Sequence, residues 1–135
     1  MMLLIYLQVE IEGMKRANIR DAVALIELAS EVEHDITSGE EDWTELKVAM
    51  RLKALRSQQM HFRTSSFDAI SAYGPNGAII HYRPTNETDT KIGTDSLFLL
   101  DSGKSVLRGV KTFFKCYYDM FICKYDSFRF CSELN

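Results

Sequence analysis

The spacing of apolar residues changes near residue 60, and this change limits the folds that the chain can adopt. Residues 13–34 and 43–59 carry apolar residues at helical spacing, whereas residues 67–73, 78–82 and 96–101 are short strand-like runs separated by turn-forming residues. Helices followed by strands predict an α+β domain, with two amphipathic helices and then antiparallel strands. A length of 135 residues suits one such domain.

The first predicted helix, residues 13–34, has apolar residues at intervals of three and four. The spacing predicts a buried stripe of Ile19, Val23 and Ile26 that continues at Ala29 and Ser30. Charged residues of both signs alternate around the rest of the helix: Lys15, Arg16, Arg20, Asp21, Glu27 and Glu31.

The second predicted helix, residues 43–59, begins with Thr44 as the expected N-cap and Glu45 in the first turn. Its predicted buried stripe consists of Leu46, Met50, Leu52 and Leu55. Its predicted solvent-facing residues are Lys47, Arg51, Lys53 and Arg56, which indicate a solvated surface rather than a binding patch.

The segment YGPNGAIIHYRP, residues 73–84, places a turn before an apolar run that ends in His81. Pro75 and Asn76 suit the two central positions of a turn. We therefore predict a hairpin in which residues 67–73 pair with residues 78–82. The later run SLFLLDSG predicts a buried strand that ends in the carboxylate of Asp101.

His81 and Asp101 are polar residues that directly follow apolar runs. A carboxylate in such a place needs a cation or hydrogen-bond donors, so the partner of Asp101 is a metal ion, a helix N-terminus or an arginine. For His81, a histidine that donates to a backbone carbonyl competes with a functional role.

Charge and cysteine content limit the class of protein and its compartment. The formal net charge of −3 gives no indication of nucleic-acid binding. Residues 104–135 carry a net charge of +3 and the remainder −6, which marks a compositional boundary near Gly103. The spacing of Cys116, Cys123 and Cys131 fits neither a disulfide framework nor a zinc site, which indicates a reducing compartment. The apolar start is too short for a membrane span or a signal peptide, so we expect a cytoplasmic protein.

Three segments together resemble the Xaa-Pro aminopeptidase (aminopeptidase P) family: EIEGMKRANIRDAVAL, the stretch from TELKVAM to IIHYRP, and LFLLDSG. This family shares the pita-bread fold with methionine aminopeptidase, prolidase and creatinase. The resemblance covers residues 10–103 and implies the first half of the catalytic domain. Residues 1–9 do not match, and residues 104–135 form a divergent basic, aromatic tail.

The resemblance implies a metal-dependent reaction that removes an N-terminal residue preceding proline. In the family two divalent cations, most commonly manganese, are held by two aspartates, one histidine and two glutamates. Asp101 matches the first of these aspartates. His81 matches a histidine that contacts the substrate and is not a metal ligand.

The chain departs from the family pattern directly after Gly103. No histidine follows His81, no glutamate pair follows, and Asp119 and Asp126 lie in surroundings unlike those of the second aspartate. We therefore expect that this chain keeps a single ligand, does not retain the metal pair and is inactive alone. The alternative function is a non-catalytic pita-bread-type binding protein. Expected partners are peptides with proline second and a full-length homologue, with neither nucleic acid nor a membrane.

The tail allows two interpretations. Val106, Val110, Phe113, Tyr117 and Phe121 recur at near-helical spacing, which predicts an amphipathic helix that docks on the domain, on a partner or on an anionic membrane surface. Enrichment in aromatic residues and cysteine without turn residues is instead typical of a retained intron or an alternative splice end.

Overall fold

The computed structural model describes residues 8–108 and 112–122, with side chains up to residue 105. Its elements follow one another as α1 (Gln8–Ser38), α2 (Glu45–Ser57), β1 (Phe62–Ser65), β2 (Ile70–Tyr73), the 3₁₀ helix η1 (Gly74–Ala78), β3 (Phe98–Arg108) and β4 (Thr112–Ile122). The predicted α+β class, with two helices before antiparallel strands, is confirmed.

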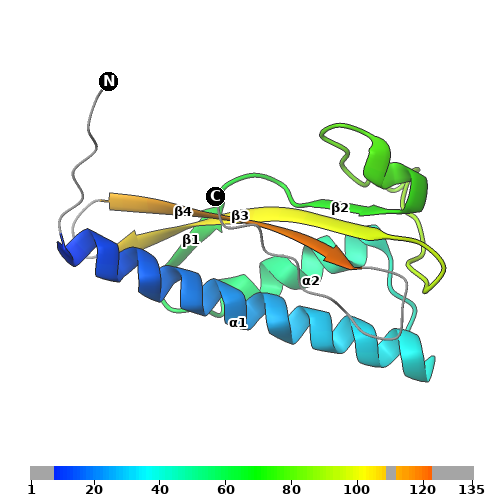
Figure 1. Cartoon of the computed structure of the whole chain (residues 1–135), viewed down its shortest axis with the longest axis horizontal. Helices are drawn as coiled ribbons and strands as arrows, with labels where there is room; N and C mark the ends of the chain where they lie inside the picture. Colours follow the sequence, from blue (N-terminus) through cyan, green and yellow to red (C-terminus); the bar gives the residue numbers. More distant parts are fainter. Residues whose placement is uncertain (1–7, 109–111, 123–135) are drawn as a thin grey trace.

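The strand β3 is the centre of an antiparallel sheet. β1 and β2 pair with successive stretches of β3, from Val106 back to Phe98, and β4 pairs with β3 over its whole length. Since a strand has two edges, β1 and β2 share one edge of β3 and β4 occupies the other. Figure 1 shows both helices on the same side of this sheet, so the domain has two layers.

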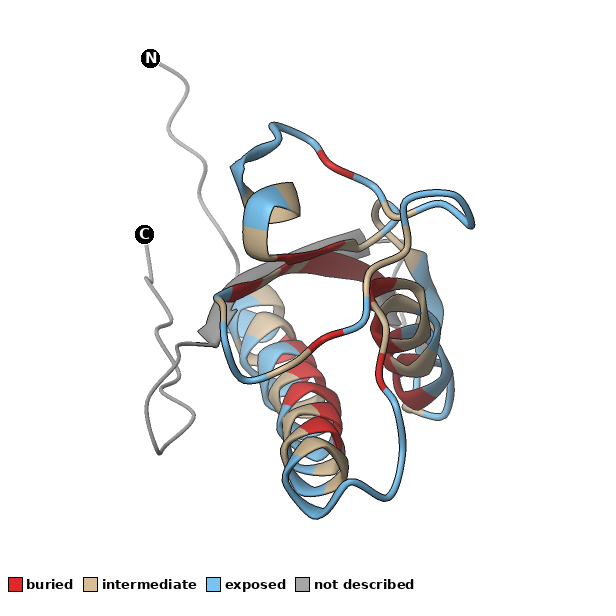
Figure 2. Ribbon diagram, turned by 90° about the vertical axis from the view of Figure 1, so that its right-hand side faces the viewer, coloured by how far each residue is buried: buried red, intermediate tan, exposed pale blue. Residues whose placement is uncertain are grey.

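Alternation along β3 divides its residues between the two faces of the sheet. Leu100, Ser102 and Lys104 are fully buried against the helices, whereas Leu99 and Asp101 on the opposite face are half-buried. In Figure 2 the buried residues of both helices lie on the sides that face the sheet. Gly103 and Ser105, also on the opposite face, are buried. The hydrophobic core lies on the helix side, and Asp101 lies on the face without helices.

The predicted buried stripe of α1 is wrong. Ile19, Val23 and Ile26 are 64%, 50% and 59% exposed. The buried face instead consists of Gly13, Ala17, Asp21, Ala24, Leu25, Leu28 and Val32. Small residues on this face allow the helix to approach the sheet closely, and Asp21 is buried because a cation from α2 meets it.

The prediction for α2 is confirmed at its start and partly wrong along its face. The Thr44 side chain caps the helix by accepting the N–H of Lys47 at 3.3 Å, and Leu52 and Leu55 are buried as expected. Met50, however, is 71% exposed, and Arg56 is 2% exposed rather than solvent-facing.

The predicted hairpin of residues 67–73 with 78–82 is also wrong. β2 pairs with β3, the GPNG segment forms η1, and residues 79–82 form a turn. Ile79 and Ile80 are exposed, so this apolar run contributes no strand to the core. Glu45 of α2 fixes the segment instead, because its carboxylate accepts hydrogen bonds from Asn76 before Ile79 and Ile80 and from Tyr82 after them.

The strand β3 continues through Gly103 to Arg108, so Asp101 lies within the strand and not at its end. A helix over residues 106–121 is wrong, because residues 112–122 form β4 along the second edge of β3. Aromatic residues favour strands, and pairing satisfies backbone groups that an open edge leaves exposed. Cys123 and Cys131 lie outside the described residues.

Candidate functional site

His81 lies at the tip of a tight turn. The N–H of Tyr82 donates to the carbonyl of Ile79 at 3.1 Å, and His81 has a φ of 56°. The left-handed region costs a residue other than glycine about 1–2 kcal/mol. His61, at φ 69° in a similar turn, shares this conformation, so strain alone does not single out His81.

The side chain of His81 is exposed and makes no hydrogen bond with another described residue. The interpretation of His81 as a buried histidine that donates to a backbone carbonyl therefore finds no support. The imidazole is presented to solvent from a turn whose neighbours are anchored.

Glu45 is the anchor of this segment. It is fully buried, and its Oε2 accepts the Tyr82 hydroxyl at 2.7 Å. Its Oε1 accepts the amide of Asn76 at 3.0 Å and the backbone N–H of Tyr73 at 2.5 Å. One carboxylate thus holds the end of β2 and both flanks of the run that carries His81. The sequence pattern indicates only that Glu45 lies at a helix start, because its partners are 28 or more residues away.

Burial raises the pKa of Tyr82 above its ordinary value, and the hydrogen bond to Glu45 adds to this effect. Burial also raises the pKa of Tyr73, whose hydroxyl donates to Asp95 and accepts the N–H of Ser96 at 3.0 Å. Both phenols therefore stay protonated and act as donors in the loops around the site.

Asp101 lies opposite Ile70 of β2 on one edge and opposite Asp119 of β4 on the other. Directly paired positions of neighbouring strands lie on the same face of a sheet. The sequence pattern around Asp119 is unlike that of the family's second aspartate, but the register brings Asp119 opposite Asp101. Strand register depends on pairing between distant residues, which motif spacing does not reveal.

The segment that carries His81 begins on the same face of the sheet as Asp101. Gly77 of η1 lies over Leu99, since a methyl group added to Gly77 would come within 4.0 Å of Leu99 Cβ. Leu99 and Asp101 are two residues apart on β3 and therefore share a face. Asp101 and η1, which precedes the turn that carries His81, thus lie on the side of the sheet opposite the helices.

The opposite face of β3 is anchored by buried charges. Arg56 Nε and Nη2 donate to the two carboxylate oxygens of Asp21 at 2.8 and 2.9 Å, and Arg56 Nη2 also donates to Ser102 Oγ at 3.0 Å. Lys104 Nζ lies 3.2 Å from Asp21. This cluster connects α1, α2 and β3 beneath Asp101.

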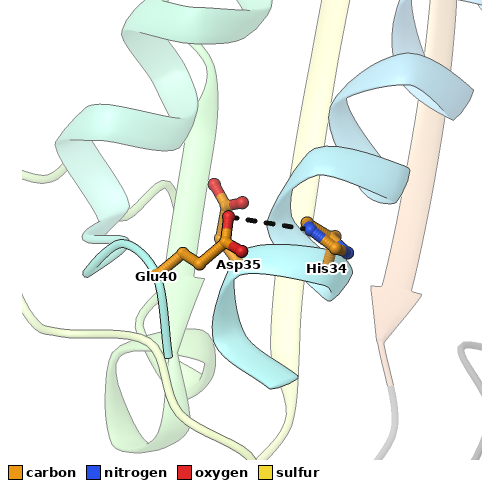
Figure 3. Close-up of side chains that lie close together, drawn as sticks. All are labelled: His34, Asp35 and Glu40. Atoms are coloured by element: carbon orange, nitrogen blue, oxygen red, sulfur yellow. Dashed lines mark ion pairs between the residues drawn. The ribbon is translucent and has the colours of Figure 1, made fainter. Parts of the chain in front are cut away.

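One group in the described part of the chain places histidine, aspartate and glutamate ligand atoms within 4.8 Å of one another, and it consists of His34, Asp35 and Glu40 (Figure 3). His34 Nε2 lies 3.7 Å from Glu40, and both side chains are 68% exposed. Asp35 Oδ2 already accepts the indole N–H of Trp43 at 2.8 Å.

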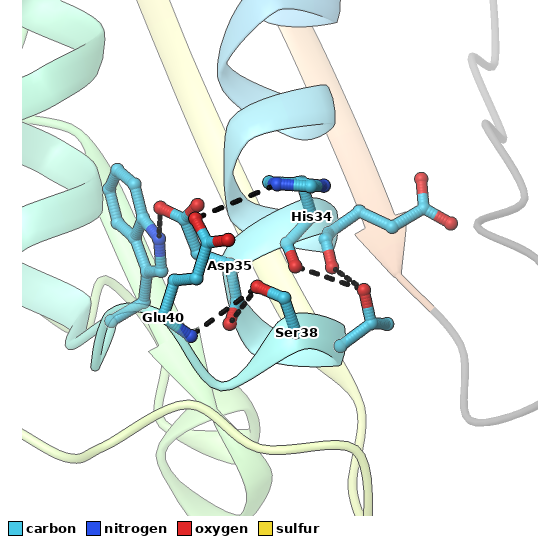
Figure 4. A network of polar contacts seen from close by, with 7 residues as sticks. His34, Asp35, Ser38 and Glu40 are labelled. Atoms are coloured by element: carbon cyan, nitrogen blue, oxygen red, sulfur yellow. Dashed lines mark hydrogen bonds and ion pairs between the residues drawn. The ribbon is translucent and has the colours of Figure 1, made fainter.

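The surrounding hydrogen bonds show that His34, Asp35 and Glu40 come together where α1 ends (Figure 4). Gly39, at φ 73°, donates its N–H to the carbonyl of Asp35, and Ser38 Oγ accepts the N–H of Glu40 at 3.3 Å. A glycine in the left-handed conformation after the last helical turn is a common helix C-cap. The three side chains therefore lie together because the chain turns back here.

Comparison with protein families identifies the fold. A family model, described as metallopeptidase family M24, matches residues 12–112. The chain belongs to metallopeptidase family M24. The predicted resemblance is thereby confirmed, and the open face that carries Asp101 belongs to an M24 domain.

Curated relatives in this family include Xaa-Pro aminopeptidase 1 of Dictyostelium discoideum, which is 45% identical over 104 residues. Aminopeptidase P2 of Arabidopsis thaliana is 43% identical over 100 residues. These alignments cover 76% and 74% of this chain but only 16% and 14% of the two relatives. The chain thus spans about a sixth or less of their length.

A solved structure, X-prolyl aminopeptidase from Caenorhabditis elegans, matches with a TM-score of 0.79 and 31% sequence identity. The match covers 90% of this chain and 19% of that one, and confirms the pita-bread architecture. That protein is described as a cytosolic enzyme with a dinuclear active site. In this M24 chain, no helix among the described residues is long and apolar enough to cross a membrane.

Asp101 and Asp119 are the acidic residues at paired positions of β3 and β4. The sequence contains no histidine after His81.

Proposed function

We propose that this chain provides part of the catalytic domain of an Xaa-Pro aminopeptidase, with Asp101 as a metal ligand and His81 as a substrate-contacting residue. The supporting observation is that η1, which leads into the turn with His81, packs over Leu99 on the same face of β3 as Asp101. The substrate class is peptides with proline at the second position, by analogy with the relatives.

His81 suits contact with a peptide because its imidazole is exposed while its flanking residues are held by Glu45. A side chain on an anchored turn loses little freedom when it binds a peptide. In the proposed role it orients the substrate beside the cation that Asp101 helps to hold.

We further propose that these 135 residues alone do not hydrolyse peptides. Manganese prefers about six oxygen and nitrogen donors, and two carboxylates leave most of its coordination to water. A second cation has no ligands of its own here. Activity then requires ligands beyond these residues, and a full-length homologue in the cytoplasm is one proposed source.

Residues 10–103 are proposed to be the part that follows the family sequence, with residues 104–135 as a divergent continuation. Sequencing the transcript on both sides of the Gly103 codon tests whether this continuation is a retained intron or an alternative splice end.

The experiment combines calorimetric titration with manganese and a peptidase assay on an Xaa-Pro peptide. We expect weak binding of at most one cation, loss of that binding in Asp101→Asn, and no release of the first residue. Asp68→Asn, at an exposed carboxylate on the loop before β2, is the matched control and leaves binding unchanged.

Tight binding of two ions, or any turnover that Asp101→Asn abolishes, would overturn the inactive assignment. Weak binding that Asp101→Asn leaves intact would instead overturn the role of Asp101 as a ligand.

A further inference from the structure

The end of α1 carries three side chains that are suited to hold one divalent cation. His34, Asp35 and Glu40 point toward one another in Figure 3, and one ligand atom of each lies within 4.8 Å of the others. His34 Nε2 and Glu40 Oε2 are 3.7 Å apart. Two ligands of the same zinc ion lie about 3–3.5 Å apart, since zinc–ligand bonds are about 2.0–2.2 Å long. Small rotations of the exposed Glu40 side chain therefore bring the three atoms into one coordination shell.

Asp35 is held in place by a residue outside this group. Its Oδ2 accepts the indole N–H of Trp43 at 2.8 Å, and Trp43 is 3% exposed. A carboxylate has two oxygen atoms, so this hydrogen bond leaves the second oxygen as a ligand atom. Hydrogen bonds of this kind orient the carboxylate ligands of metal sites. The core of the domain thus fixes one ligand, while His34 and Glu40 are open to solvent.

The charge of this region favours a cation. Residues 31–42 contain six acidic residues and neither lysine nor arginine. Within the part of the chain that the structure describes, no lysine or arginine forms an ion pair with Asp35 or Glu40. The last turn of α1 also has no basic residue, although the C-terminus of a helix carries partial negative charge. A bound cation offsets this concentration of negative charge.

We propose that His34, Asp35 and Glu40 bind one zinc ion, with water in its remaining coordination positions. One imidazole nitrogen and two carboxylate oxygens suit zinc, whereas magnesium and calcium prefer oxygen ligands alone. The ion joins the end of α1 to the loop that precedes α2. The site is on the helix side of the sheet and Asp101 lies on the opposite face, so the proposal does not rest on the proposed function.

Titration of the full chain with zinc chloride, followed by the fluorescence of Trp43, tests the proposal. Trp43 is the one tryptophan of the sequence and contacts a proposed ligand, so zinc binding should change its emission. We expect a saturable change at one ion per chain, with a dissociation constant at least about tenfold higher in His34→Ala and in Glu40→Gln. His61→Ala is the matched control, because His61 is an exposed histidine outside the group, and it should bind like the wild type.

Thermal unfolding gives a second readout of the same site. An ion that binds only the folded chain stabilises it, so zinc should raise the Tm of the wild type and of His61→Ala. The rise should be smaller in His34→Ala, which lacks the imidazole ligand. Magnesium chloride should change neither the emission of Trp43 nor the Tm to a comparable extent.

Unchanged Trp43 emission on addition of zinc would overturn the proposal, as would a dissociation constant that His34→Ala leaves unaltered or that His61→Ala raises equally. An equal response to magnesium would also overturn it, because it would show a general attraction of cations to acidic residues. His34 and Glu40 are each 68% exposed, so both variants should remain folded, and circular dichroism without metal checks this. If His34→Ala does not fold, the dissociation constant of Glu40→Gln decides.

Discussion

Arg56 of α2 and Asp21 of α1 form a two-bond ion pair in the interior of the domain. The two donor–acceptor distances are 2.8 and 2.9 Å, and the exposed fractions of the side chains are 2% and 0%. Ser102 and Lys104 of β3 complete the contact. Both helices are thereby held in a fixed position against the strand that carries Asp101.

Asp21→Ala tests this ion pair. The substitution leaves Arg56 and Lys104 as buried cations without their shared carboxylate, so we expect a loss of about 3–5 kcal/mol in the free energy of unfolding. Urea denaturation measures this change. Glu31→Ala is the control, because it breaks the part-exposed pair with Arg51 and should cost about 0–1 kcal/mol. Equal costs for the two variants would show that the buried pair has no special role.

Glu45→Gln tests the carboxylate that anchors the His81 segment. The amide keeps the shape but replaces an acceptor oxygen with a donor that faces other donors, so we expect a loss of about 2–3 kcal/mol. Hydrogen exchange of residues 74–92 should become faster. Glu41→Gln, at an exposed carboxylate on the preceding loop, serves as the control. Unchanged exchange in Glu45→Gln would contradict the anchoring role.

Alkaline pH should destabilise the chain through Tyr82. Burial raises the pKa of Tyr82 above 10.0, so the folded chain holds the phenol proton more tightly than the unfolded chain. The stabilisation that results is complete below pH 10 and is lost as the pH rises through the pKa of the folded state. Urea denaturation at pH 9 to 11 should show a steeper fall for the wild type than for Tyr82→Phe. Parallel falls would mean that other groups cause the loss.

His81→Gly separates stability from peptide binding. Glycine removes the cost of the left-handed conformation but gives the unfolded chain more freedom, so the free energy of unfolding should change by less than about 1 kcal/mol. NMR titration with an Xaa-Pro peptide should show reduced binding for His81→Gly. His61→Gly, at the same kind of turn position, should bind like the wild type. Loss of binding in both variants would point to a general effect of the added flexibility.

Local patterns predicted the parts of the fold that depend on neighbouring residues. The structure confirms both predicted helices, the Thr44 cap, and strands at residues 70–73 and 98–101. Each of these features depends mainly on residues close together in the sequence. The resemblance carried by the segments around His81 and Asp101 was confirmed by the family comparison.

The faces of the helices were predicted less well, because burial of a charge depends on a partner far away in the sequence. Asp21 and Arg56 are 35 residues apart and read separately as solvent-facing residues. Their pairing allows both to be buried, while Ile19 and Met50 remain exposed. A prediction from hydrophobicity alone buries Ile19 and Met50 and exposes Asp21 and Arg56, which is the reverse of what the structure shows.

The sequence by itself determined the α+β class, the family and the identity of His81 and Asp101 as candidate site residues, since these depend on local spacing and on motif residues. Only the tertiary structure decided that His81 lies in a turn and that Asp101 lies opposite Asp119. Strand partners and turn positions depend on which distant segments form backbone hydrogen bonds with β3 and which form hydrogen bonds with the buried carboxylate of Glu45. These contacts join residues far apart in the sequence, so the pattern within one segment does not reveal them.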